Sequence, residues 1–188
     1  INIIVNKLPE AKAEDGIICY NSKTNTLIKA YTIQSGLSAT SYTFQWFDDD
    51  KKLVGTTSNY KAILPGIYTL ITTSNATGCS SEPMAIIVSP SEPAEITYKI
   101  TEDFADNAII NVIAIGEGGN YEYKLGFGPY QDSPVFENVP SGIHKITVRD
   151  KNGCGVSSTD VLVIKYPKFF TPNGDGYNDT WNISELEN

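Results

Sequence analysis

Histidine and cysteine are scarce in this sequence of 188 residues, which has one histidine and three cysteines. Most nucleophilic and general-base catalysis relies on such side chains, held close to a serine, a cysteine or a metal. His144 stands alone, and no serine nucleophile elbow, P-loop or cysteine–histidine pair is present. We therefore expect a protein that is not an enzyme, and we expect His144 to be a structural or surface residue.

Basic residues are also few, with 14 Lys and Arg against 22 Asp and Glu and a formal net charge of −8. The Lys and Arg residues are scattered, so a basic face for phosphates is lacking and nucleic acid is excluded as a partner. The acidic run Asp48, Asp49 and Asp50 is expected to be a solvated hairpin tip first and a weak cation site second.

Long apolar runs are absent as well. No stretch approaches the roughly 18 apolar residues that a membrane helix needs, and the sequence does not open with a basic segment followed by an apolar one. We expect a soluble fragment of a longer protein, with any export signal upstream of Ile1.

What the sequence does contain is a series of short β-type runs separated by turn clusters, without helical periodicity beyond two turns. Seven strands are predicted in the first ninety residues, a spacing that is typical of a β-sandwich. They are residues 1–5, 16–20, 25–33, 41–47, 58–63, 66–73 and 83–88.

Aromatic residues mark the predicted core of this first sandwich. Trp46 shares one strand face with Tyr42 and Phe44, and we expect it at the centre of the core. Tyr68 is expected to form a tyrosine corner, in which its hydroxyl bonds back to the backbone. Tyr42 and Tyr60 could instead belong to an exposed aromatic stripe that binds sugar, and this alternative stays open.

An internal repeat extends this plan to the second half. GIYTLITTSNATGC at 66–79 aligns with GIHKITVRDKNGC at 142–154, and SYTFQWF at 41–47 aligns with NYEYKLGF at 120–127. The sequence thus predicts an all-β chain of two tandem immunoglobulin-like β-sandwich domains, at 1–90 and 91–166. They are joined through the stiff segment SPSEPAE, and residues 167–188 follow the second domain.

The C-terminal stretch YPKFFTPNGDGYNDTWNI combines tight turns with oxygen-bearing side chains. Asn173, Asp175 and Asp179, with the Tyr177 carbonyl, could bind calcium weakly, because hard cations take oxygen ligands around a glycine turn. In the other interpretation the same carboxylates accept backbone N–H bonds in an Asx-turn loop. Both interpretations stay open.

The string FFTPNGDGYNDTWNI resembles the opening of the type B, gliding motility-associated, C-terminal sorting domain of Bacteroidetes proteins that are exported by the type IX secretion system. The proteins that carry this domain include SprB-type gliding adhesins. It is carried by Phe170, Thr171, Pro172, Asn173, Gly174, Asp175, Gly176, Asn178, Asp179, Trp181 and Ile183. It implies that residues 167–188 form a linker and the truncated start of a third β domain. It also implies a cell-surface or secreted, outer-membrane-associated protein and a partner among the type IX outer-membrane components, a barrel-type membrane protein that recognises the signal.

The second unit is similar to the SprB repeats of long gliding adhesins, through Gly142, Ile143, Ile146, Thr147, Val148, Asp150, Asn152, Gly153 and Cys154. An exported chain meets an oxidising compartment, so a disulfide is expected. Cys19 and Cys79 lie in the same repeat and are predicted to pair, which leaves Cys154 as a free thiol.

Three functions are weighed. The first is a non-enzymatic stalk region of a large adhesin. Pro167 and Pro172 cannot donate to a sheet ladder, so the last sandwich must end before the segment from Phe169. In this hypothesis an outer-membrane partner recognises that segment. The recognition residues are Phe169, Phe170, Pro172, Asn173, Gly174, Asp175, Gly176, Asn178, Asp179 and Trp181. The alternative is an accessory carbohydrate-binding module of a secreted polysaccharide-degrading enzyme, which would contact a surface polysaccharide; the third is a small hydrolase.

Overall fold

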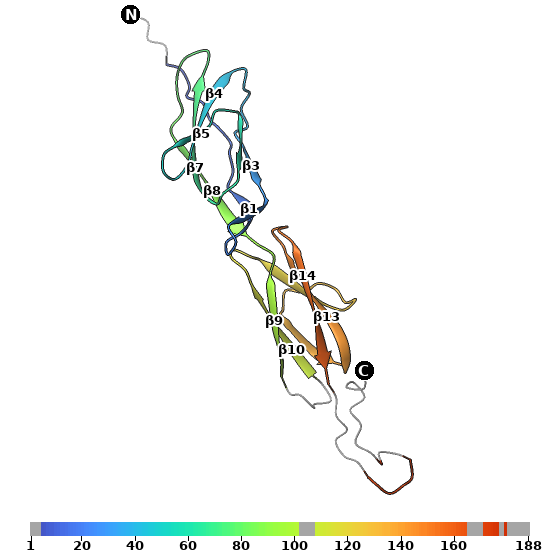
Figure 1. Ribbon diagram of the computed structural model, residues 1–188. Coiled ribbons are helices and arrows are strands. Elements are labelled where there is room, and N and C mark those ends of the chain that lie inside the picture. The colour runs from blue at the N-terminus through green and yellow to red at the C-terminus, as the bar shows by residue number, and fades with distance from the viewer. Residues whose placement is uncertain (1–4, 102–107, 165–170, 177–178, 180–188) are drawn as a thin grey trace, which may run out of the picture. The chain divides into compact units, whose positions relative to one another are not determined.

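The computed structural model describes residues 5–101, 108–164, 171–176 and 179. All regular secondary structure in this part of the chain is β-strand, and the chain divides into two compact units between Glu92 and Pro93 (Figure 1). The predicted all-β fold is thus confirmed. Within the described ranges, no helix is long and apolar enough to cross a membrane.

The first unit is a sandwich of a six-stranded sheet, in the order β2-β1-β8-β7-β4-β5, and a two-stranded sheet of β3 and β6. All neighbours are antiparallel except β1 and β8, which run parallel. The strands are β1 (Gly16–Asn21), β2 (Thr26–Lys29), β3 (Tyr31–Gln34), β4 (Tyr42–Phe47), β5 (Leu53–Gly55), β6 (Asn59–Ala62), β7 (Gly66–Ser74) and β8 (Met84–Ser91).

Trp46 lies at the centre of the first core, as predicted. Side chains alternate along β4, so Phe44 and Trp46 are buried while Thr43 and Gln45 face solvent. The Trp46 indole is fully buried and donates from Nε1 to the Thr57 carbonyl at 2.8 Å. Its ring stacks on Tyr60, with 5.8 Å between the ring centroids. The buried indole therefore has both an apolar contact and a partner for its one polar atom.

The predicted strand at 25–33 is in fact two strands in different sheets. β2 pairs with β1 in the six-stranded sheet, whereas β3 pairs with β6 and turns Ile33 into the core. The chain changes sheets at Ala30, between the two strands. The three-residue strand β5 was not predicted, because it is too short to show an alternating pattern. In the predicted strand at 1–5, Val5 is not in a strand, and residues 1–4 lie outside the described residues.

The second unit is a sandwich of two three-stranded antiparallel sheets, ordered β12-β10-β9 and β11-β13-β14. Its core is made of inward-facing aliphatic side chains from both sheets, including Ile110, Val112, Ile146 and Val148. The strands are β9 (Glu95–Thr101), β10 (Ala108–Ile115), β11 (Tyr121–Leu125), β12 (Val135–Val139), β13 (Gly142–Asp150) and β14 (Val156–Val163).

The two repeats share a corner that ties a strand to the chain preceding it. The Tyr68 hydroxyl donates to the Leu64 carbonyl at 2.8 Å, which confirms the predicted tyrosine corner. In the second unit, His144 occupies the equivalent position, and its Nε2 lies 2.8 Å from the Pro140 carbonyl oxygen. Both bonds span four residues, so the single histidine makes the contact that tyrosine makes in the first unit.

The predicted domain boundary falls two residues before the observed one. β8 continues to Ser91 and β9 starts at Glu95, so most of the segment predicted as a stiff linker is strand. The parallel pairing of β1 with Ser89, Pro90 and Ser91 explains the extension, since it gives this end of β8 a ladder partner.

Candidate functional site

The C-terminal turn closes around one carboxylate. Asp179 Oδ1 accepts the backbone N–H groups of Asn173 and Gly174 at 3.0 and 2.6 Å, and its Oδ2 accepts that of Gly176 at 2.7 Å. Gly174 and Gly176 have φ angles of 77° and 83°, which only glycine adopts freely. The two glycines therefore allow the chain to point three N–H groups at a single side chain.

These bonds lower the pKa of Asp179 below its ordinary value. The largest contribution comes from the N–H of Gly174, followed by that of Gly176, while partial desolvation acts in the opposite direction and the N–H of Asn173 adds to the lowering. A hydrogen bond donated to the charged form favours that form. Asp179 is therefore an ionised turn cap at neutral pH.

The other two predicted ligands bond to each other. Asn173 Nδ2 donates to Asp175 Oδ2 at 2.7 Å, and the Asp175 N–H donates to Asn173 Oδ1 at 3.3 Å. With Asp179 surrounded by N–H donors, this geometry fits the Asx-turn interpretation better than a cation cage. Tyr177 lies outside the described residues, which contain no cluster of three His, Cys, Asp or Glu side chains suited to a metal. The calcium site stays a prediction.

The predicted recognition residues fall partly within the structure. Pro172, Asn173, Gly174, Asp175 and Gly176 are exposed, so this part of the segment is accessible to a partner. The predicted aromatic anchors Phe169, Phe170 and Trp181, together with Asn178, lie outside the described residues. The turn is therefore the part of the predicted recognition element whose geometry is known.

The predicted pairing of Cys19 with Cys79 is wrong. Cys79 has a free thiol, whereas Cys19 and Cys154 are both disulfide-bonded. Cys19 pairs in register with Ser91, the last residue of β8, three residues past Val88, which pairs with Gly66 at the start of β7. The Cys79 carbonyl, in contrast, accepts the N–H of Ser74 at the far end of β7. A nine-residue strand spans about 27 Å. Disulfides require Cα atoms within about 7 Å of each other.

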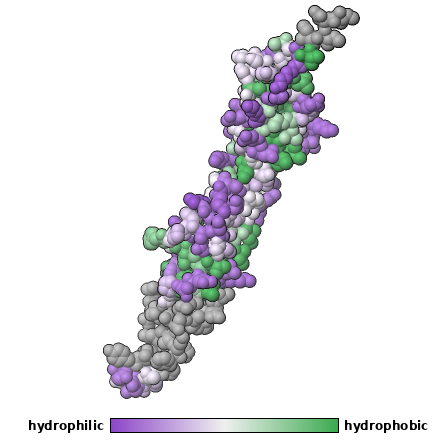
Figure 2. All heavy atoms as spheres, turned by 180° about the vertical axis from the view of Figure 1, so that it is seen from behind, coloured by the Kyte–Doolittle hydropathy of each residue, from purple (hydrophilic) through white to green (hydrophobic). Residues whose placement is uncertain are grey.

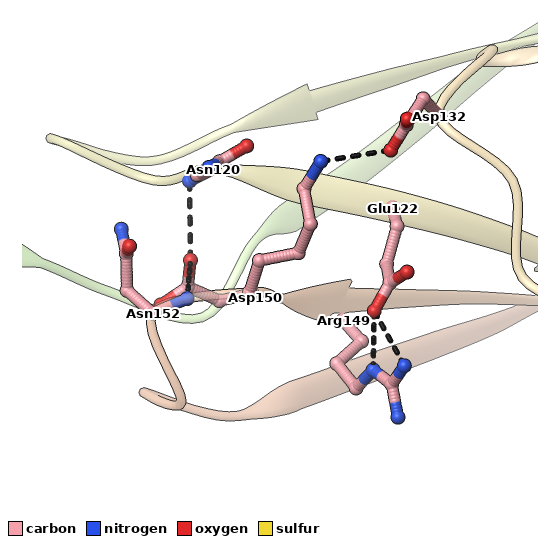
Figure 3. Close-up of polar contacts among 7 residues, drawn as sticks. Asn120, Glu122, Asp132, Arg149, Asp150 and Asn152 are labelled. Carbon is pink, nitrogen blue, oxygen red and sulfur yellow. Dashed lines mark hydrogen bonds and ion pairs between the residues drawn. The ribbon is translucent and has the colours of Figure 1, made fainter.

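A buried aspartate organises the turn after β13 in the second unit. Asp150 is 2% exposed and accepts the N–H groups of Asn120 at 3.1 Å and of Asn152 at 3.2 Å (Figure 3). It also accepts the N–H of Cys154, at 3.2 Å. Buried charges need such partners. The DKNGC string, predicted only as a repeat signature, thus forms a turn around the Asp150 side chain.

Two ion pairs beside this turn were not predicted. Arg149 Nε donates to Glu122 Oε1 at 2.6 Å, and Lys151 Nζ lies 2.8 Å from Asp132 Oδ1 (Figure 3). The Asp132 hydrogen bond is the main cause of a raised Lys151 pKa. The Arg149 guanidinium also lies over the Tyr130 ring, 4.1 Å from its centroid. The repeat alignment could have found the Glu122–Arg149 pair, because these residues face each other across β11 and β13.

The aromatic residues left open for sugar binding are engaged in the first core. Tyr60 stacks on Trp46 and lies against Tyr68, with centroid separations of 5.8 and 5.1 Å, and Tyr42 is half-buried against the same cluster. The most exposed aromatic side chain of the described residues is Phe127, in the loop after β11, which sequence reasoning missed. A fully exposed phenylalanine leaves no periodic signal.

The acidic run forms the predicted hairpin tip between β4 and β5. Lys51 has a positive φ of 59°, and its N–H donates to the Asp48 carbonyl at 2.9 Å. Both Asp49 oxygens accept the N–H of Ile67, at 3.1 and 3.2 Å. The tip therefore packs against the start of β7, and a groove of about 330 Å³ lies between them.

Taken together, the strand order, the buried Trp46 and the corners define an all-β protein of tandem immunoglobulin-like sandwiches. The sequence matches no protein-family model and no curated protein.

Solved structures with similar chains include the following three. A C-terminal 282-residue fragment of intimin, solved with the intimin-binding domain of Tir, is 14% identical over 84% of this chain and 64% of that one, with a TM-score of 0.44. The FN1–FN3 domains of chicken CNTN1 are 13% identical over 83% and 65%, with a TM-score of 0.42. The CD2-binding domain of CD58 is 12% identical over 82% and 98%, with a TM-score of 0.45.

The chain thus spans less than two thirds of the length of the first two of these structures. At such identities the likeness concerns the fold alone.

Proposed function

We propose that this chain is a non-enzymatic stalk region of a large cell-surface adhesin that functions in gliding motility or attachment. Its two sandwiches act as spacers, and the segment from Phe169 onward begins a type IX sorting signal that an outer-membrane partner recognises. Tandem immunoglobulin-like units and disulfide-bonded cysteines suit an exported, surface-exposed protein.

The observation that carries the proposal is the turn closed by Asp179. Three N–H groups bonded to one carboxylate hold the exposed stretch from Pro172 to Gly176 in a defined shape. A pre-ordered segment loses less conformational entropy on binding than a disordered one. This is what a recognition signal requires, and the string resembles the type B sorting domains in the residues that build the turn.

The alternative, a carbohydrate-binding module of a polysaccharide-degrading enzyme, has less support. Sugar rings stack on free aromatic faces, whereas Tyr60 lies between Trp46 and Tyr68. Phe127 is exposed, but a single ring is a small platform.

The turn can be tested in the full-length parent protein with point variants. Asp179→Ala removes the acceptor of all three N–H bonds and is expected to lower surface display severalfold, measured by antibody labelling of intact cells. Asp160→Ala, an exposed carboxylate on β14, is the matched control and should display normally. Normal display of Asp179→Ala, with equal total protein, would contradict the proposed role of the turn.

A further inference from the structure

The groove of about 330 Å³ between the β4–β5 tip and the start of β7 has no role in the function proposed above. Its walls are mainly aliphatic and aromatic, and its rim is acidic. The lining residues are Asp48, Asp49, Asp50, Val54, Tyr60, Ile63, Leu64, Pro65, Gly66, Ile67 and Tyr68. We call this set the tip groove.

Several apolar side chains of the tip groove are in contact with solvent. Ile63 and Leu64 are each 52% exposed, and Ile67 is 47% exposed. Ile67 lies directly opposite Ile87, which is 50% exposed, so the apolar surface continues across β7 onto β8. Figure 2 shows apolar areas between polar ones on one face of the first unit. Contiguous exposed apolar surface bordered by polar residues is typical of protein interaction sites.

The walls of the groove are held in place by hydrogen bonds. The Tyr68 hydroxyl fixes the Leu64 carbonyl, and the Asp49 carboxylate fixes the Ile67 N–H. The Asp48 Oδ1 atom accepts the Lys52 N–H at 2.9 Å within the tip itself. The groove is therefore formed before any partner arrives.

The rim of the groove is negatively charged. No ion pair between described residues involves Asp48, Asp49 or Asp50. The pKa of Tyr60, which lines the groove, is raised mainly by burial and also by the negative charge of Asp48. The charge of Asp48 therefore acts on the groove. A carboxylate offers about four acceptor sites, so each of the three can accept further hydrogen bonds.

We propose that the tip groove binds a segment of a partner protein that carries lysine or arginine beside aliphatic side chains. The aliphatic side chains would cover Ile63, Leu64 and Ile67, and the cations would pair with the acidic rim. A polysaccharide fits less well, because aliphatic walls give it few hydrogen bonds and the Tyr60 ring already contacts Trp46 and Tyr68. This site is independent of the sorting signal.

The test is NMR titration of the ¹⁵N-labelled chain with the peptide Ac-Leu-Arg-Leu-Arg-Leu-NH₂. The matched peptide Ac-Leu-Glu-Leu-Glu-Leu-NH₂ and cellohexaose serve as comparison probes. We expect the arginine peptide to shift the amides of the tip groove, with a response that weakens as salt is added. The glutamate peptide and cellohexaose should leave them unchanged.

Variants separate the charge from the apolar wall. The double substitution Asp48→Asn and Asp50→Asn keeps shape and should weaken binding about tenfold, as expected for two rim charges. Ile63→Ser should also weaken binding, while Glu82→Gln, an exposed acidic residue elsewhere in the first unit, should not. Equal response to both peptides, shifts located elsewhere, groove shifts with cellohexaose, or unchanged affinity of the double variant would each overturn the proposal.

Discussion

At the scale of single residues, Thr72 stands out because its hydroxyl is buried without a partner. Thr72 is fully buried on β7, and its Oγ1 is the one buried side-chain polar atom of the described residues that lacks a hydrogen bond. The repeat places Val148 at the equivalent position of β13. Thr72→Val should therefore raise the free energy of unfolding, by about 1 kcal/mol.

Urea denaturation of the whole chain measures this change. The control is Thr73→Val on the same strand, whose hydroxyl bonds to Ser80 at 2.9 Å and which should not stabilise the protein. A Thr72→Val protein that is less stable than the wild type would show that the hydroxyl has a partner in solution.

The turn that closes around Asp179 is expected to depend on pH. Its pKa is lowered from 3.8 by three N–H bonds, so the closed turn is favoured in the ionised form. This stabilisation is fully present above the ordinary carboxyl pKa and is lost as pH falls through the lowered pKa. In an NMR titration, the Gly174 and Gly176 amide shifts should follow the Asp179 titration. Titration of Asp179 at or above its ordinary pKa, or glycine amides insensitive to pH, would contradict the closed turn.

At the scale of structural elements, the corners before β7 and β13 are expected to make equal contributions. Tyr68→Phe removes the bond to the Leu64 carbonyl and His144→Phe removes the bond to the Pro140 carbonyl. Each should cost about 1 kcal/mol of unfolding free energy in chemical denaturation. His144→Tyr should retain stability, because tyrosine makes this contact in the first unit. If His144→Tyr were as unstable as His144→Phe, the corners would not be equivalent.

The sequence predicted the positions of the strands better than it predicted which strands pair. Alternation found β4 and placed Trp46 inside, because burial of one strand face leaves a pattern of period two. It joined β2 and β3, since a change of sheet after Lys29 does not interrupt the run of strand-forming residues. The turn cap by Asp179 was one of two interpretations, because the same oxygens suit N–H donors and cations.

At the scale of the whole molecule, the cysteines show why sequence proximity misleads. Cys19 and Cys79 share a repeat, but the register of β1, β7 and β8 puts them at opposite ends of the first sheet. The tip groove and the ion pairs likewise depend on contacts between different strands, such as the contact of Glu122 with Arg149. Periodicity does not encode which strand ends meet.

The thiol chemistry follows from this arrangement. Alkylation of the unreduced, denatured chain should label Cys79 alone, because Cys19 and Cys154 are disulfide-bonded. Cys79→Ser should leave the melting temperature nearly unchanged, whereas Cys19→Ser should lower the unfolding free energy by about 2–4 kcal/mol. Peptide mapping that found Cys79 in an intramolecular crosslink, or three free thiols, would contradict the structure.

The central claim is that the two sandwiches are spacers and that the stretch after them is the sorting signal. Truncation of the parent protein immediately before Lys168 tests it most directly, by protease accessibility and antibody labelling at the surface of intact cells. The account predicts that both sandwiches stay folded, as judged by circular dichroism and thermal melting, while the truncated protein is lost from the cell surface. A truncated protein that still reached the surface and stayed attached would contradict it.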